Sequence, residues 1–168
     1  MNPGAAIAVV VGIAALAWRW LSKPSAEPKK QPATPRAFIS FDFDHDEGIK
    51  RLFAGQCRKN SPTPFAAQDW SSKESLPQAT WEETIEAKIS SCHLMFVLVS
   101  PTAHRASGIA KEIAMATKHH VPIVGVYIKD ADAATPLPPN LGRDRVHAWK
   151  WERLATAIDA AMKEGKNR

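Results

Sequence analysis

Short apolar runs alternate with amphipathic stretches from residue 37 onward. The run at 93–99 has almost no polar interruption, which is typical of a strand buried on both faces. The stretch 46–59 instead places its apolar side chains on one helical face. We expect strands at 37–41, 65–68, 93–99, 121–128 and 145–149, and helices at 46–59, 81–91, 108–119 and 152–163. Thr80 and Ser107 are the expected caps of the second and third helices.

This alternation predicts an α/β fold of the flavodoxin-like, three-layer type, with helices on both faces of a five-stranded parallel sheet. The strand order expected for such a fold is 2-1-3-4-5. Ligands of these sheets bind beyond the carboxyl ends of the strands, where the strand order reverses. Here that point lies between strands 1 and 3, which selects residues 41–46 and 100–107. The polar loop 69–75 is expected to border the same crevice.

A different pattern precedes the globular part. Residues 4–18 carry no charge, and with Leu21 the apolar stretch reaches about 18 residues, enough for a hydrocarbon core of ~30 Å. Lys and Arg follow the uncharged residues 4–18 and do not precede them. The asymmetry predicts a single transmembrane helix within residues 1–21, with residues 4–21 in membrane lipid, the N-terminus outside and the remainder in the cytoplasm. A cleaved signal peptide is the alternative, although a basic n-region is missing.

Residues 22–36 contain four prolines and few apolar side chains, which predicts an extended linker. Its lysines are suited to anionic headgroups or simply to solvent. The predicted organisation is therefore an anchor at 1–21, a linker at 22–36 and one globular domain at 37–168.

Charge and cysteine content exclude several classes of protein. The chain of 168 residues has a formal net charge of +5. Residues 1–36 account for +4 of it (five Lys/Arg, one Asp/Glu), leaving +1 for the domain, so we expect no nucleic-acid partner. Cys57 and Cys92 have neither a zinc-ligand spacing nor the number needed for a disulfide framework.

Acidic residues are the first candidates for chemistry. Asp42, Asp44 and Asp46 follow the first predicted strand. Closely spaced carboxylates suit a cation or a ribose, whereas a helix cap and solvated loop residues are the structural alternative. Glu112 lies in a predicted helix whose apolar positions face the sheet. A carboxylate beside that seam, near the start of the helix, is able to look into the crevice, whereas an ordinary surface glutamate is the alternative that composition alone favours.

Five short motifs occur in the order that TIR domains show. They are Phe38-Ile39-Ser40-Phe41, Asp69-x-Ser71, Val97-Leu98-Val99-Ser100-x-Thr102, Lys111-Glu112-Ile113 and Pro122-Ile123-Val124-Gly125-Val126. In this order residues 37–150 resemble TIR-like domains, and more narrowly the bacterial family that includes the Thoeris anti-phage protein ThsB. Family members often carry an aromatic residue four positions before the glutamate, where this chain has Gly108.

The resemblance implies cleavage of NAD at the nicotinamide–ribose bond, giving ADP-ribose or a cyclic isomer as a signal. Glu112 matches the catalytic glutamate of the family. The expected substrate-binding residues are Phe41, Asp42, Asp69, Trp70, Ser71 and Ser100, with the two aromatic residues as stacking surfaces. NAD is then a substrate, and neither a metal nor a further cofactor is expected. A homo-oligomer and a downstream effector that senses the nucleotide product are the expected protein partners.

Two other functions remain open at this stage. One is a TIR-like assembly module that recruits partners without turning over NAD. The other is a phosphatase of the haloacid-dehalogenase type, because Asp42-x-Asp44 after a strand resembles its nucleophile and acid. The sequence has Asp46 where that family has Thr or Val, and no length for a cap domain.

Overall fold

The computed structural model describes residues 34–59, 61, 66–67 and 77–168. The predicted anchor and most of the predicted linker lie outside these ranges. No helix within the described ranges is both long and apolar enough to cross a membrane.

Parallel strands form one sheet in the order β2-β1-β3-β4-β5. Its strands are β1 (Arg36–Ser40), β2 (Ala66–Ala67), β3 (Leu94–Val99), β4 (Ile123–Tyr127) and β5 (Val146–Ala148). The parallel α/β architecture and the strand order confirm the prediction. Strand β2, at the edge of the sheet, has two residues, so the other four strands make up nearly all of it.

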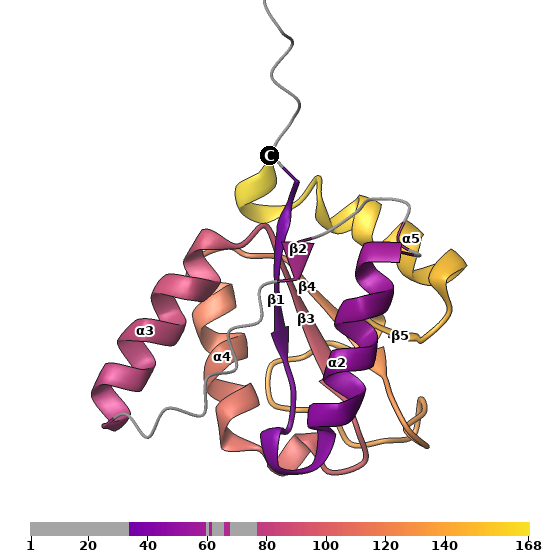
Figure 1. The fold of residues 1–168 in the computed structure, drawn as a ribbon, viewed down its shortest axis with the longest axis horizontal. Helices are drawn as coiled ribbons and strands as arrows, with labels where there is room; N and C mark the ends of the chain where they lie inside the picture. Colours follow the sequence, from indigo (N-terminus) through magenta and orange to yellow (C-terminus); the bar gives the residue numbers. More distant parts are fainter. Residues whose placement is uncertain (1–33, 60, 62–65, 68–76) are drawn as a thin grey trace, which may run out of the picture. The chain divides into compact units, whose positions relative to one another are not determined.

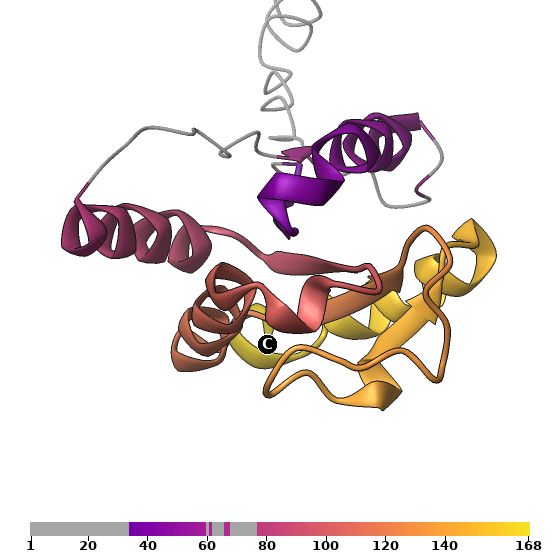
Figure 2. The ribbon, with the colours of Figure 1, turned by 90° about the horizontal axis from the view of Figure 1, so that it is seen from below.

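Helices cover both faces of the sheet (Figure 1). They are α2 (Phe43–Lys59), α3 (Gln78–Ser91), α4 (Ser107–Lys118) and α5 (Trp151–Ala161), with short 3-10 turns η1 (Ala103–Arg105), η2 (Arg143–Arg145) and η3 (Gly165–Asn167). In Figure 1, α3 and α4 lie on one side of the strands, and α2 and α5 on the other. Figure 2 shows the molecule from below, the side on which α2 and α4 begin.

Alternate residues of the strands build two separate cores. Ile39 and Phe96 face the core that α2 and α5 complete, whereas Phe38 and Val97 face the core beneath α3 and α4. All six residues of β3 are fully buried, as the continuous apolar run predicted. The backbone of β4 at Gly125 lies close to the side chain of Val146 on β5. A Cβ on Gly125 would be only 2.8 Å from Cγ2 of Val146. Any larger residue at 125 would displace Val146.

The helix starts differ from the prediction. Helix α2 begins three residues early, because the Asp42 carbonyl accepts the amides of His45 and Asp46 at 3.2 and 2.8 Å. Thr80 and Ser107 are not caps. They lie inside α3 and α4, whose N-cap residues are Pro77 and Ala106 and make no side-chain cap hydrogen bond. Proline fixes its own φ, which restricts the chain entering α3.

Candidate functional site

A cavity of about 660 Å³ opens at the carboxyl ends of β1 and β3, where the strand order predicted a crevice. Four segments form its walls: the β1–α2 connection, α3, η1 and the first half of α4. The charged and polar lining residues are Asp42, Asp44, His45, Thr102, Arg105, Ser107 and Glu112. Aromatic and aliphatic side chains make up most of the remaining wall, so the cavity is apolar with a few convergent polar groups, as ligand sites usually are.

Glu112 on α4 contributes one of the acidic groups of this site. Ile109 and Ile113 are buried against the sheet and hold its helix in place. Ser40, the last residue of β1, donates a hydrogen bond of 2.5 Å from its Oγ to Glu112 Oε2. Burial raises the pKa of Glu112 to about 7, and the Ser40 hydrogen bond opposes this rise because it favours the charged form. A carboxyl group that titrates near neutral pH is suited to chemistry at that pH.

Removing the Ser40 hydroxyl is expected to move the titration of Glu112 to higher pH. In Ser40→Ala the burial of the carboxyl group is kept and the opposing hydrogen bond is lost, so the midpoint should lie above the wild-type value of about 7. Carbon-13 NMR of labelled glutamate side chains measures it. Thr117→Ala, which removes a hydroxyl from the same helix, serves as the control. An unchanged or lower midpoint in Ser40→Ala would contradict the assignment.

The three carboxylates after β1 do not converge on one point. Asp42 Oδ2 contacts His45 Nδ1 at 2.9 Å and accepts a hydrogen bond of 3.1 Å from Thr102 Oγ1. Asp46 is fully buried and pairs with Lys129, whose Nζ lies 2.5 Å from its Oδ1. Asp44 lines the cavity. Across the described ranges, no group of three His, Cys, Asp or Glu residues is placed to hold a metal ion.

Four of the seven predicted site residues fall within the described structure. Glu112, Phe41 and Asp42 line the cavity together. Phe41 also packs beside Phe43, with ring centroids 5.8 Å apart. Ser100 is buried and is not among the lining residues; its Oγ lies 3.3 Å from Thr102 Oγ1. The other three, Asp69, Trp70 and Ser71, lie outside the described residues.

Several lining residues were not among the sequence-based candidates. Trp81 comes from α3, outside both predicted crevice segments, whereas Thr102 and Arg105 lie within the predicted segment 100–107 although neither was singled out there. The pattern favoured Trp81 only as a helix residue, and nothing in the sequence brings α3 to this edge of the sheet. His45 lies within the predicted crevice segment 41–46, so its position was available from sequence although its contact with Asp42 was not.

Together the parallel sheet, the cavity at its carboxyl edge and the glutamate on α4 define a TIR-like α/β domain. A family model described as "Thoeris protein ThsB, TIR-like domain" matches residues 38–133, more than half of the chain. The protein therefore belongs to this family. Both the family and the fold argue against the haloacid-dehalogenase interpretation of Asp42 and Asp44. No curated protein matches the chain.

Solved structures with a similar fold include three from different systems. A metazoan TIR-STING receptor from C. gigas is 19% identical with a TM-score of 0.49, and the match covers 73% of this chain and 38% of the receptor. The TIR domains of the activated Roq1 resistosome are 16% identical, with coverage of 77% and 73% and a TM-score of 0.44. A prokaryotic SEFIR domain is 17% identical, with coverage of 77% and 96% and a TM-score of 0.44. The chain thus spans about two fifths of the receptor's length, and likenesses this distant carry no information on activity.

Proposed function

We propose that this TIR-like domain cleaves NAD at the nicotinamide–ribose bond, releasing nicotinamide and giving ADP-ribose or a cyclic isomer as a signal. The observation that carries the proposal is the placement of Glu112. Its carboxyl group lies in an apolar cavity at the carboxyl edge of the sheet, is held by Ser40 and has a pKa raised to about 7.

A buried carboxylate is suited to this bond cleavage for an electrostatic reason. The carbon–nitrogen bond breaks with its electron pair going to nicotinamide, which leaves a positively charged, oxocarbenium-like ribose. A nearby carboxylate stabilises that charge more strongly in an apolar cavity than in water. The pyridinium of bound NAD also favours the ionised form of Glu112, because an opposite charge lowers the pKa of a carboxyl group.

Other lining residues fit the remainder of a dinucleotide. Phe41 and Trp81 offer aromatic faces for the adenine or nicotinamide ring. Arg105 is exposed at the cavity, and a guanidinium is well matched to the oxygens of a diphosphate. Within the described ranges its guanidinium has a single contact, from Nε to His104 Nε2 at 3.3 Å.

We also propose a cellular location, protein partners and a biological role for this activity. The apolar stretch 4–21, uncharged as far as residue 18, supports a single-pass membrane anchor that leaves the domain in the cytoplasm. A homo-oligomer is expected to complete or activate the site, and a separate effector is expected to sense the product. Membership in the Thoeris ThsB family makes anti-phage defence the biological role that we propose.

Nicotinamide release tests the activity directly. The full chain, reconstituted in lipid vesicles at high protein density, is incubated with NAD, and nicotinamide is quantified by chromatography. We expect release by the wild type and a decrease of about 10²- to 10³-fold in Glu112→Gln, the range seen when one transition-state-stabilising group is removed. Glu82→Gln, an exposed glutamate on α3, is expected to behave as the wild type.

Two results would contradict the proposal. Equal release by the wild type and Glu112→Gln would assign cleavage to another group. An absence of release from wild-type protein whose folding is shown by circular dichroism would instead favour the TIR-like assembly module.

A further inference from the structure

An aspartate–histidine pair lines the same cavity as Glu112. His45 Nδ1 lies 2.9 Å from Asp42 Oδ2. The Asp42 side chain is 11% exposed and the His45 side chain 61%. One ring nitrogen of His45 therefore contacts a nearly buried carboxylate. The other, Nε2, has no partner among the described residues and belongs to a ring that lines the open cavity.

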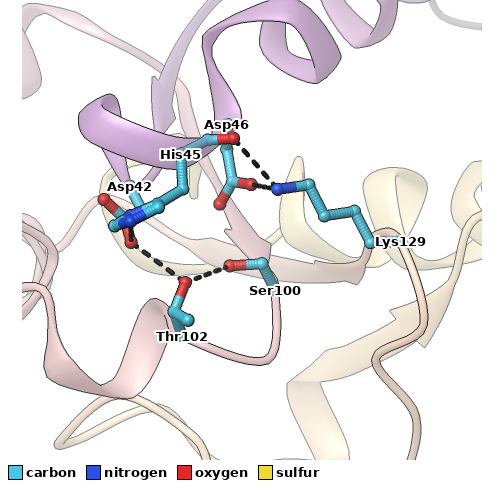
Figure 3. Close-up of polar contacts among 6 residues, drawn as sticks. All are labelled: Asp42, His45, Asp46, Ser100, Thr102 and Lys129. Atoms are coloured by element: carbon cyan, nitrogen blue, oxygen red, sulfur yellow. Dashed lines mark hydrogen bonds and ion pairs between the residues drawn. The ribbon is translucent and has the colours of Figure 1, made fainter.

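The protons in this network can be assigned from its connectivity. Asp42 Oδ2 accepts the single hydroxyl proton of Thr102, so the 3.3 Å contact between Thr102 and Ser100 requires Ser100 as donor (Figure 3). A carboxylate oxygen is a hydrogen-bond acceptor, so the tautomer that fits this contact is the one in which His45 donates from Nδ1. Neutral His45 then has its lone pair on Nε2, the arrangement of a histidine base whose tautomer is fixed by a carboxylate.

Lys129, which follows β4, contacts the backbone of His45 and the neighbouring Asp46. Lys129 Nζ donates to the carbonyl oxygen of His45 at 2.9 Å and lies 2.5 Å from Asp46 Oδ1 (Figure 3). Since Asp46 is fully buried, this pair ties the first turn of α2 to the chain after β4. Asp42 thus holds the ring of His45 and Lys129 holds its backbone carbonyl, while Thr102 holds Asp42.

We propose that His45 is the general base for the second half of the reaction, and that Asp42 is its positioning residue. The inference rests on the proposed NAD cleavage and specifies which residue accepts the proton of the water that attacks the ribosyl cation. Once nicotinamide has left with the electron pair of its bond, a water oxygen bonds to C1′ of the ribosyl cation. The water proton passes to His45 Nε2 and then to solvent. The sum is NAD⁺ plus water giving ADP-ribose, nicotinamide and H⁺.

A purely structural role for the same contact makes a different prediction. Asp42 directly precedes α2 and His45 is in its first turn, so the pair also stabilises the start of the helix. Loss of that role lowers the amount of folded protein and decreases all products in the same proportion. Loss of a base decreases only those products whose formation requires removal of a proton.

Competition between water and a pyridine separates these roles. The full chain in vesicles is given NAD and 3-acetylpyridine, and nicotinamide, ADP-ribose and the exchanged dinucleotide are measured together. A neutral pyridine nitrogen attacks C1′ without losing a proton, whereas water must lose one. We expect His45→Ala to lower ADP-ribose formation about 10²-fold and to raise the ratio of exchange to hydrolysis by about the same factor.

Companion variants strengthen the test. Asp42→Asn is expected to shift the ratio in the same direction by a smaller factor, because the ring of His45 loses its fixed tautomer. Added imidazole is expected to restore hydrolysis in His45→Ala. His147→Ala replaces a histidine on β5 that does not line this cavity, and its ratio should equal that of the wild type.

The outcomes are distinguishable. If the wild type releases nicotinamide and the ratio in His45→Ala is unchanged, the role of His45 is overturned while the proposed NAD cleavage stands. If the wild type forms neither ADP-ribose nor the exchanged dinucleotide and releases no nicotinamide, the proposed NAD cleavage and the role of His45 are both overturned. A poorly folding His45→Ala does not obscure the result, because the ratio is independent of the amount of active protein.

Discussion

Glu112→Gln should unfold at a higher temperature than the wild type at pH 8 and at nearly the same temperature at pH 4. Burial raises the pKa of Glu112 from its ordinary value of 4.5 to about 7 in the folded protein. Between pH 4.5 and pH 7 the Glu112 carboxyl group loses its proton in the unfolded chain and keeps it in the folded protein. The free energy of unfolding of the wild type therefore falls as pH rises through this range. Above pH 7 both states are charged, and the folded protein carries the full cost of a buried carboxylate.

The size of this effect follows from the two pKa values. Their difference corresponds to about 3 kcal/mol, or roughly 10 °C in Tm for a domain of this length. Glutamine keeps an oxygen that accepts the Ser40 hydroxyl and never ionises, so the variant avoids the cost. Together with the expected loss of nicotinamide release, this result would make Glu112 a residue retained for chemistry against stability.

Calorimetry of both proteins from pH 4 to pH 8 measures the difference. Glu82→Gln is the matched control, because Glu82 is exposed and Lys111 and Gln78 lower its pKa. For Glu112→Gln, the Tm difference from the wild type should increase between pH 4.5 and pH 7. For Glu82→Gln, it should stay constant over this range. A Tm difference for Glu112→Gln that does not vary with pH would contradict the buried, raised-pKa carboxyl group.

Phe53→Ala is expected to lower the free energy of unfolding by about 3–5 kcal/mol, the usual cost of emptying a phenylalanine site in a core. Phe53 on α2 is completely buried. Its ring centroid lies 5.0 Å from that of Phe96 in β3, 5.4 Å from Trp149 and 6.0 Å from Trp151. The substitution therefore removes the aromatic contacts of α2 with the central strand and with the start of α5.

Urea unfolding followed by tryptophan fluorescence measures this loss. Leu52→Ala is the control, since the neighbouring side chain is 53% exposed and surface substitutions usually change stability by about 0.5 kcal/mol or less. A cost for Phe53→Ala no larger than that for Leu52→Ala would show that this aromatic cluster does not anchor α2. The free energy of unfolding of most globular domains is only ~5–15 kcal/mol, so the expected loss is a large share of it.

The layered fold was predictable because it depends on short-range patterns. The apolar run at β3 and the alternation of strands with amphipathic helices sufficed for a parallel sheet in the order 2-1-3-4-5. That order in turn placed the crevice at the ends of β1 and β3. The length of β2 and the starts of α3 and α4 were not predictable, because they depend on weak propensities and backbone conformation rather than on periodicity.

The sequence by itself determined the class of fold and the edge of the sheet where the cavity opens, and it singled out Glu112, which lines that cavity. Only the tertiary structure decided what the neighbouring polar residues do. Asp42 and Ser40 look alike in sequence as polar residues near the end of a strand. In the structure, however, the Asp42 carboxylate contacts His45 and the Ser40 hydroxyl contacts Glu112, 72 positions away in the sequence. Contacts of that kind depend on how β1, β3 and α4 pack, and burial, which sets the pKa of Glu112, exists only after packing.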